Sequence, residues 1–113
     1  MRQVIAFIKA HKVDDVTLAL HGLDALPGLS VSHVRGFGHG WRRPDDAERA
    51  GEVDDLHDTA RLEVFCANTL ADAVVDTIER HAHTGLRGDG NIYVCEVRES
   101  VRISTGERGE AER

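Results

Sequence analysis

Residues 84–91 read TGLRGDGN, a short stretch whose composition is suited to binding phosphate. Glycine has no side chain, so the backbone N–H groups of such a stretch can approach phosphate oxygens closely. The stretch lacks the spacing and the terminal Gly-Lys of a Walker phosphate loop, and it ends in Asn91 where a phosphate loop would place a lysine. The same residues lie between a helix-like segment and the β-branched run NIYV, so they are also typical of a turn that starts a strand. Taken alone, the stretch favours the turn.

The composition indicates one small globular domain. The chain has 113 residues, of which 41% are hydrophobic and 30% charged, enough for a single hydrophobic core. Its 20 acidic and 14 basic residues give a net charge of −6. This charge argues against a nucleic-acid partner, because neutralising phosphates needs a cationic surface. We also expect no membrane insertion, because no apolar run approaches membrane-spanning length and MRQVIAFIKAHK is too short and too quickly charged for a signal peptide.

The two cysteines, Cys66 and Cys95, each lie in an apolar, strand-like run. We expect both to be buried, reduced thiols rather than partners in a disulfide. Reduced cysteines are typical of the cytoplasm, so the expected localisation is cytoplasmic.

Hydrophobic periodicity predicts alternating strands and helices. Strands are expected at 2–8, 29–37, 60–66 and 91–97, with a short fifth at 101–104 and a frayed polar tail. A helix is expected at 13–24, ended by Pro27-Gly28, and a second one begins with Asn68 as its cap and is stopped by Gly85. Its inner face is expected to consist of Leu70, Ala73, Val74, Ile78 and His81. The order βαββαβ predicts a ferredoxin-like α+β domain, with two helices on one face of a four-stranded antiparallel sheet.

A segment without periodicity separates the second and third expected strands. Residues 38–59 are rich in Gly, Arg and Asp and carry one large aromatic residue, Trp41, followed by Arg42 and Arg43. A loop of this length inside a small domain is usually functional or unstructured. The segment is therefore either a solvated connection or an arm that docks a partner, with Trp41 as its anchor.

Four blocks of the sequence together resemble the PII signal-transduction family, also called nitrogen regulatory protein P-II. These blocks are IKAHKVDDVTLAL, VRGFG, TGLRGDGNIYV and VRISTGERGEA, and the resemblance runs from Met1 to about Ala111 in the same order and spacing. It implies a single PII-like domain over residues 1–113. In the terms used for that family, the T-loop is expected at about 38–59, the B-loop at 84–91 and the C-terminal segment at 101–113.

The resemblance implies a homotrimer that binds ATP or ADP in clefts between subunits and changes its T-loop to engage or release a target protein. The adenosine end of the site is then expected at Phe7, Gly28, Ser30, Glu63 and Phe65. Phosphates are expected to lie beside Gly36, Phe37 and Gly38 and the B-loop residues Gly88, Asp89, Gly90 and Asn91, with Arg102 arriving from the neighbouring subunit. Magnesium is a further expected ligand of the bound nucleotide.

Several residues depart from the family's pattern. Asn91 stands where related proteins have lysine and Ser104 where they have a second arginine, so two phosphate-directed cations are missing. Each charge-assisted bond contributes roughly 1.5–3 kcal/mol, so we expect weakened triphosphate binding and a shift towards ADP or AMP. His39 replaces an arginine, and is either a partial, pH-dependent substitute or a solvent-facing histidine.

Other departures concern the family's further activities. Gly40 replaces a glutamine and Thr59 a lysine, which argues against sensing of 2-oxoglutarate. Glu52 replaces the modifiable T-loop tyrosine, and the one tyrosine, Tyr93, belongs to an expected strand. Uridylylation by the family's usual route is therefore not expected.

The blocks KAHKVDDVTLAL, AHTGLRGDG and RISTGERGEA together resemble PII-like proteins associated with heavy-metal efflux systems. The leading hypothesis is a non-enzymatic regulator that responds to nucleotides and acts on a membrane transporter, or on a protein associated with one, through residues 38–59. The alternative is a trimer that binds divalent metal, using His57 with Asp54, Asp55, Asp58 and His39. No HxxxH or CxxC pair supports a metal site, so none is assigned. An acylphosphatase-like enzyme is excluded because AFIKAHK lacks the glycines that such an enzyme places after its first strand.

Overall fold

A computed structural model describes residues 1–24, 26–36 and 57–109 of the chain. Phe37, Gly38, His39, Gly40, Trp41, Arg42, Arg43, Glu52, Asp54 and Asp55, for which roles were considered above, lie outside the described residues. The elements follow in the order β1 (Arg2–Lys9), a 3-10 turn η1 (Ala10–Lys12), α1 (Val13–His21), β2 (Leu29–Gly36), β3 (His57–Cys66), α2 (Asn68–Ala82), β4 (Asn91–Glu96), β5 (Ser100–Val101) and β6 (Arg108–Gly109).

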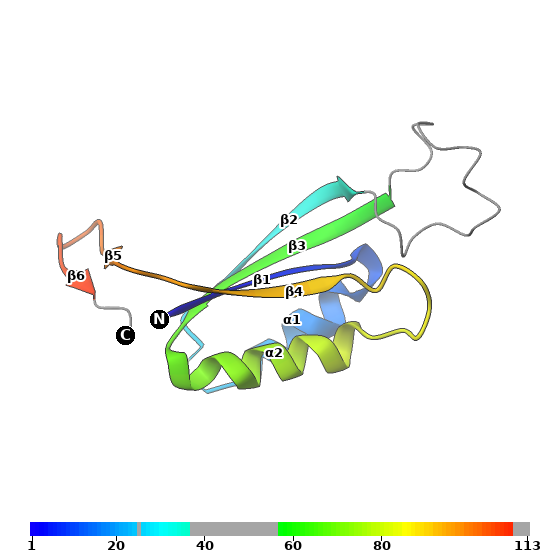
Figure 1. Cartoon of the computed structure of the whole chain (residues 1–113), viewed down its shortest axis with the longest axis horizontal. Helices are drawn as coiled ribbons and strands as arrows, with labels where there is room; N and C mark the ends of the chain where they lie inside the picture. The colour runs from blue at the N-terminus through cyan, green and yellow to red at the C-terminus, as the bar shows by residue number, and fades with distance from the viewer. Residues whose placement is uncertain (25, 37–56, 110–113) are drawn as a thin grey trace.

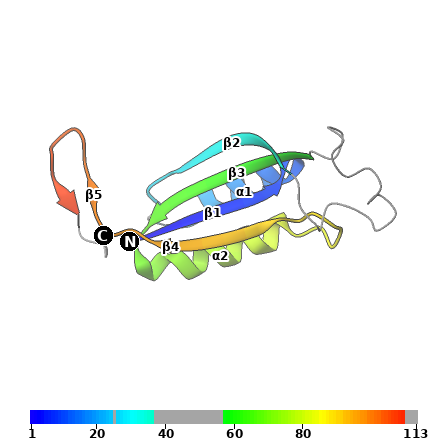
Figure 2. The same cartoon turned by 45° about the horizontal axis from the view of Figure 1, so that its top comes forward.

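The main sheet has four strands in the order β2-β3-β1-β4, and every neighbouring pair is antiparallel. Both helices cover the same face of this sheet, and its other face carries no helix (Figure 1, Figure 2). The predicted ferredoxin-like α+β fold is confirmed. In the register of β1 and β3, Lys9 lies opposite Thr59 at one end of the sheet and Arg2 lies opposite Cys66 at the other.

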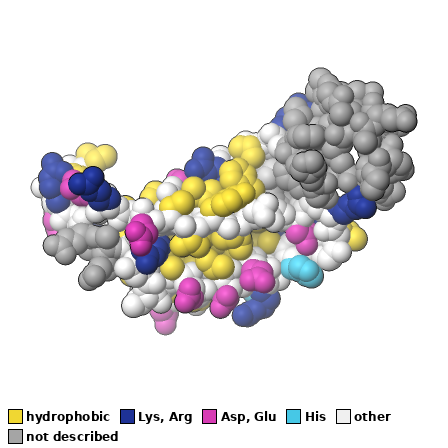
Figure 3. Space-filling model, in the orientation of Figure 1, with side chains coloured by type: hydrophobic (Ala, Val, Ile, Leu, Met, Phe, Trp, Pro, Cys, Tyr) yellow, Lys and Arg dark blue, Asp and Glu magenta, His cyan; other side chains and the backbone are white. Residues whose placement is uncertain are grey.

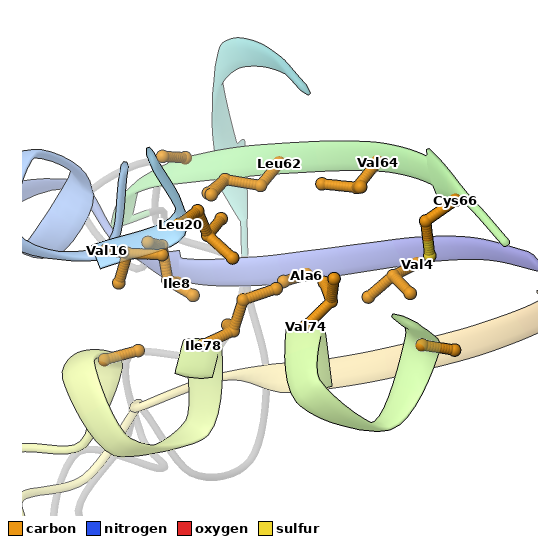
Figure 4. Close-up of a cluster of buried hydrophobic side chains, with 13 residues drawn as sticks. Val4, Ala6, Ile8, Val16, Leu20, Leu62, Val64, Cys66, Val74 and Ile78 are labelled. Carbon is orange, nitrogen blue, oxygen red and sulfur yellow. The ribbon is translucent and has the colours of Figure 1, made fainter. Parts of the chain in front are cut away.

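The core forms between the helices and the sheet because side chains of a strand alternate between its two faces. In β1 the alternate residues Val4, Ala6 and Ile8 are buried. They meet buried residues of β3, α1 and α2, which are Ala60, Leu62, Val64, Cys66, Val16, Leu20, Ala71, Val74, Ile78 and Ala82 (Figure 4). On the surface of the domain, seen in the orientation of Figure 1, hydrophobic side chains gather across the middle of the molecule. Acidic side chains lie along its lower edge, at α2 (Figure 3).

The helix ends differ from the sequence prediction. Helix α1 ends at His21, three residues early, where the Gly22 N–H bonds to the carbonyl oxygens of Ala19 and Leu20. Asn68 is the first residue of α2 rather than its cap; Ala67 occupies the N-cap position, and no side-chain hydrogen bond caps the helix. The buried positions of α2 are Ala71, Val74, Ile78 and Ala82, and Leu70 is partly buried against the core. The predicted inner face is therefore correct at Leu70, Val74 and Ile78, whereas His81 is half-buried and its ring Nδ1 lies 2.9 Å from the Thr77 carbonyl oxygen.

Two strand boundaries also needed correction. Strand β3 begins at His57, so residues 57–59, predicted as loop, extend the sheet. The short fifth strand predicted at 101–104 is confirmed only at Val101: β5 covers Ser100–Val101 and pairs with β6 in a small hairpin that stands apart from the main sheet (Figure 1). Within this hairpin Gly106, at φ 72°, donates to the Arg102 carbonyl oxygen at 2.7 Å. The predicted frayed tail was residues 105–113, and its described part, 105–109, belongs to this turn and strand, with Arg108 in a 2.7 Å ion pair with Glu99.

The prediction that both cysteines are buried is correct for Cys66 and wrong for Cys95. Cys66 is 1% exposed in the core, and burial raises the pKa of its thiol. Cys95 lies opposite Gln3 in the register of β1 and β4, on the face of the sheet that no helix covers. An apolar run in a strand shows that a surface favours burial, but it does not show whether a neighbouring element covers that surface.

Candidate functional site

A cavity of about 600 Å³ lies at the end of the sheet where Lys9 and Thr59 pair. Its walls come from the last residues of β1 and β2, the first residues of β3 and β4, and the loop before β4. The lining residues are Phe7, Val34, Arg35, Gly36, Thr59, Gly88, Asp89, Gly90, Asn91 and Tyr93. Antiparallel neighbours bring the end of one strand beside the start of the next, so residues far apart in sequence meet here.

Part of the predicted site converges on this cavity. Six of the residues assigned from the sequence line it, namely Phe7, Gly36, Gly88, Asp89, Gly90 and Asn91. They come from three separate sequence blocks, so their meeting is a result of the fold. The glycine-rich stretch is therefore more than a connection into β4, because it forms one wall of a cavity large enough for a small molecule.

The remaining predicted residues lie elsewhere. Phe65 and Arg102 line a second cavity, of about 480 Å³, together with Met1 and Pro27. This cavity lies at the other end of the sheet, where Arg2 pairs with Cys66. The set of predicted site residues is thus divided between two ends of one chain.

Four further members of the predicted set line neither of these cavities. Ser30 lies opposite Glu63 in the register of β2 and β3. The Glu63 carboxylate accepts hydrogen bonds from Gln3 at 2.8 Å and from Arg61 at 3.1 Å, so it is already engaged within the chain. Gly28 precedes β2 and Ser104 is an exposed residue of the hairpin. None of these residues lines the 600 Å³ cavity.

Tyr93 is a cavity residue that the sequence analysis missed. Its ring lies edge-on to that of Phe7, with centroids 6.3 Å apart and an interplanar angle of 78°. The Tyr93 side chain is 52% exposed, so an aromatic surface remains accessible at the cavity. Alternation along β4 was the available signal, because residues 91 and 93 of one strand must share a face.

The glycine-rich loop approaches β1 closely. Gly88 and Gly90 have φ values of 80° and 100°, which glycine adopts without the penalty that a side chain brings. A Cβ atom at Gly90 would collide with the carbonyl oxygen of Phe7. Only glycine at position 90 therefore permits the loop to lie against β1 in this geometry.

Asp89 holds the loop from within. Its Oδ2 accepts hydrogen bonds from the backbone N–H groups of Thr84, at 2.9 Å, and Gly85, at 3.1 Å. Its Oδ1 accepts a short hydrogen bond from the Thr84 hydroxyl and lies 3.2 Å from the Lys9 ammonium. Partial burial favours a higher pKa for the Asp89 carboxyl, but the hydrogen bonds from Thr84 and Gly85 and the contact with Lys9 outweigh it, so this pKa lies well below the usual range.

Lys9 and Thr84 complete the network. The Lys9 ammonium donates to the Thr84 hydroxyl at 3.0 Å, and that oxygen also accepts the Leu86 N–H at 3.0 Å. The side chains of Lys9 and Asp89 are 21% and 25% exposed. The carboxylate of Asp89, assigned above to nucleotide binding, is therefore directed at its own loop.

Charge at the cavity is modest. Asn91 contributes a neutral amide at the position where the family pattern has a lysine. Arg35 is a cationic residue of the cavity lining. Thr59, singled out above as a departure from the family pattern, is 3% exposed and also lines the cavity. Among the described residues, the cavity lining thus combines aromatic, amide and glycine surfaces with a single arginine.

Residues 1–24, 26–36 and 57–109 contain neither a cluster of metal-binding side chains nor a membrane-spanning helix. In that part of the chain no group of three or more His, Cys, Asp or Glu side chains is placed to hold a metal ion. The His39, Asp54 and Asp55 of the alternative hypothesis lie outside it. None of the helices described is both long and apolar enough to cross a membrane.

A ferredoxin-like α+β domain with a glycine-walled cavity at one end of its sheet is the class of protein that these features define. Comparison with known proteins agrees with this class. The family described as "Nitrogen regulatory protein P-II" matches residues 1–107.

Curated relatives match almost the whole chain. Nitrogen regulatory protein P-II of Azospirillum brasilense is 37% identical over 109 residues, covering 96% of each chain, and that of Rhizobium meliloti (strain 1021) is 38% identical with the same coverage. Nitrogen regulatory protein P-II 1 of Escherichia coli (strain K12) is 36% identical over 111 residues, covering 98% of each chain. The chain therefore belongs to the P-II family of non-enzymatic signal-transduction proteins.

Proposed function

We propose that this protein binds adenine nucleotides in clefts between the subunits of a homotrimer and uses residues 38–59 to regulate a target protein. The observation that carries the proposal is the division of the predicted site. Six of its residues line the cavity at one end of the sheet, whereas Phe65 and Arg102 line another cavity at the opposite end. A ligand that uses both groups has to lie between two copies of the chain, with one copy supplying each group.

The face of the sheet without helices supports this assembly. Phe65 and Tyr93 are 43% and 52% exposed in the single chain. They lie opposite Gln3 and Ile5 of β1, on the same uncovered face as Cys95. Burying these apolar side chains against other copies would remove them from water, which stabilises an oligomer by roughly 25 cal/mol per Å² of apolar surface.

The chemistry of the cavity suits an adenine nucleotide. The Phe7 and Tyr93 rings offer an aromatic surface to a purine, and the Gly88–Gly90 backbone can approach phosphate oxygens closely. Arg102 of the neighbouring copy supplies a guanidinium that can pair with phosphate in a bidentate manner. Asn91 and Ser104 lack charge, so the site should favour ADP or AMP over ATP more than a site with lysine and arginine at these positions.

Magnesium would be bound through the nucleotide's phosphates. Among the described residues that line the 600 Å³ cavity, Asp89 is the one carboxylate, and it is engaged by Lys9, Thr84 and Gly85. We therefore assign no described residue to magnesium.

The target side of the proposal rests on the sequence. In the sequence of segment 38–59, Trp41 is followed by Arg42 and Arg43, and we assign these three residues to anchoring a partner. The sequence blocks that resemble PII-like proteins associated with heavy-metal efflux support a membrane transporter, or a protein associated with one, as the proposed target, and we propose a cytoplasmic location for the regulator. We also assign residues 84–91 to phosphate binding and residues 101–113 to contact with the neighbouring subunit.

Isothermal titration calorimetry of the full chain with ATP, ADP and AMP, with and without magnesium, tests the proposal. We expect a homotrimer by light scattering and saturable binding of one nucleotide per chain. Arg102→Ala should lower the affinity about tenfold or more, because a charge-assisted bond is lost. Arg108→Ala is the matched control, because Arg108 belongs to the same hairpin but pairs with Glu99. A trimer that binds none of the three nucleotides at millimolar concentration would overturn the nucleotide-binding function.

A further inference from the structure

The network around Asp89 joins three parts of the chain at the cavity. Lys9 is the last residue of β1, and Thr84 lies two residues beyond the end of α2. Asp89 itself belongs to the loop that lines the cavity. Through one carboxylate, the end of the first strand and the exit of the second helix are therefore fixed relative to the glycine-rich wall.

Ordering the loop at residues 84–91 is costly in conformational entropy, so the loop requires a stabilising contact. Gly85, Gly88 and Gly90 all have positive φ, between 79° and 100°. Glycine has more backbone freedom in the absence of contacts than any other residue, so ordering a loop that contains three of them costs conformational entropy. The Asp89 carboxylate offsets this cost by accepting from two backbone N–H groups and one hydroxyl while lying beside the Lys9 ammonium.

We propose that Asp89 is the positioning residue of the phosphate-binding wall, held by Lys9 and Thr84, and does not itself contact the nucleotide. The inference rests on the proposed function and changes the role assigned to Asp89 from the sequence. In this arrangement the loop presents the backbone of Gly88 and Gly90 to phosphate in an ordered state before the ligand arrives. Preorganisation of this kind raises affinity because the ordering cost is met before binding.

The network also decides what Lys9 does. Its ammonium lies 3.2 Å from Asp89 Oδ1 and donates to the Thr84 hydroxyl. A lysine paired in this way adds little net positive charge at the cavity, because the carboxylate beside it cancels the charge at longer range. Lys9 therefore acts on the loop, and it is not a replacement for the cation missing at Asn91.

Asp89→Asn tests the inference, since it keeps the shape of the side chain and removes the charge. We expect its affinity for ATP and ADP to fall about tenfold or more, while its affinity for adenosine changes less than about threefold, because the loss falls on the phosphate-facing wall. Thr84→Ser should retain most of the phosphate affinity because it keeps the hydroxyl, whereas Thr84→Val should lose it. Asp15→Asn is the matched control; it removes another lysine–aspartate contact, the 3.0 Å pair with Lys12 on α1.

Amide hydrogen exchange of the ligand-free protein provides an independent readout. Residues 84–91 should exchange faster in Asp89→Asn than in the wild type, and should be unchanged in Asp15→Asn. Unchanged ATP affinity in a folded Asp89→Asn protein overturns the inference, and so does an equal loss for ATP, ADP and adenosine, which a merely structural role would produce. If the wild-type protein binds no nucleotide, the proposed function fails first. If instead the wild type binds and Asp89→Asn binds equally well, only the positioning role fails.

Discussion

Gly90 lies so close to Phe7 that a Cβ atom at position 90 would collide with the Phe7 carbonyl oxygen. Phe7 belongs to a central strand of the sheet and Gly90 to the loop before the edge strand β4. Their contact sets how far the loop descends onto β1, and both residues line the 600 Å³ cavity. The shape of the cavity thus depends on the absence of one methyl group.

Gly90→Ala should be markedly destabilising. It combines a backbone conformation of φ 100° with a collision against backbone, which cannot rotate away as a side chain can. We expect the free energy of unfolding to fall by about 3 kcal/mol or more. Chemical denaturation at equal protein concentration provides the measurement.

Gly106→Ala separates the two causes. Gly106 also has positive φ, at 72°, but a Cβ atom there meets nothing within 4 Å. It should therefore cost only the backbone term, about 1–2 kcal/mol. Equal losses in the two variants would show that the Phe7 contact contributes nothing to the effect of Gly90→Ala.

Acid should remove the stabilisation that Asp89 provides. The pKa of the folded-state carboxyl is depressed, so its contribution is complete above the usual aspartate pKa of about 3.9 and is lost as the pH falls below that value. At pH 7 we expect Asp89→Asn to be less stable than the wild type by about 1–2 kcal/mol, since the carboxylate is only a quarter exposed. The gap between the two proteins should narrow as the pH is lowered through 4 towards 2, as measured by denaturation at each pH.

The Lys12–Asp15 pair again serves as the comparison. The Asp15 side chain is 64% exposed, and an exposed pair contributes at most about 1 kcal/mol. Asp15→Asn should therefore differ little from the wild type at pH 7. A gap for Asp89→Asn that stays constant down to pH 2 would mean that its charge is not the source of the stabilisation.

The main fold followed from local patterns because those patterns are regular. Alternation in β1 and helical spacing in α2 identify Val4, Ala6, Val74 and Ile78 as core residues, and the element order then fixes the sheet. The hairpin of β5 and β6 could not be found in this way, because strands of two residues have no period. The exposure of Cys95 could not be predicted from the sequence either, because it depends on whether another element covers that face of the sheet.

The candidate site was predictable only where a motif carried it. The glycine-rich block placed Gly88 and Gly90 in the cavity without any knowledge of the fold. Tyr93 lies beyond the glycine-rich block, which ends at Asn91, so the motif did not indicate it, although both residues lie on one face of β4. The role of Asp89 could not be predicted, because its partner Lys9 comes from the other end of the chain and only tertiary structure brings the two together.

Asn91→Lys should add a charge-assisted bond between the protein and the phosphates of the nucleotide. Asn91 is exposed and lines the cavity, so a lysine there can extend towards phosphate without entering the core. We expect the affinity for ATP to rise about tenfold, and the ATP-to-ADP preference to rise with it, because ATP carries more negative charge for the new cation. Calorimetry with both nucleotides gives the ratio directly.

Asn68→Lys is the control for a general effect of charge. Asn68 is an exposed residue at the start of α2, outside the lining of the 600 Å³ cavity. It changes net charge by the same amount and should leave the ATP-to-ADP ratio unchanged. An unaltered ratio in Asn91→Lys would count against placing residue 91 beside the phosphates.

Mixing two defective variants tests whether the site lies between subunits. Tyr93→Ala removes an aromatic group from the 600 Å³ cavity, and Arg102→Ala removes a guanidinium from the other end of the chain. Each variant alone should form trimers in which every site lacks one half, so both should bind ADP weakly. In trimers assembled at random from equal amounts of the two, about a quarter of the interfaces combine an intact Tyr93 with an intact Arg102.

Calorimetry of the mixed protein should therefore show a minor class of sites with wild-type affinity, close to that fraction of the total. The control is a mixture assembled from Tyr93→Ala and the double variant Tyr93→Ala/Arg102→Ala, in which no interface contains Tyr93. If each site were built within one chain, mixing would restore nothing, because every chain would keep its own defect. Recovery in the first mixture and none in the control is the result that the division of the site between the two ends of the sheet requires.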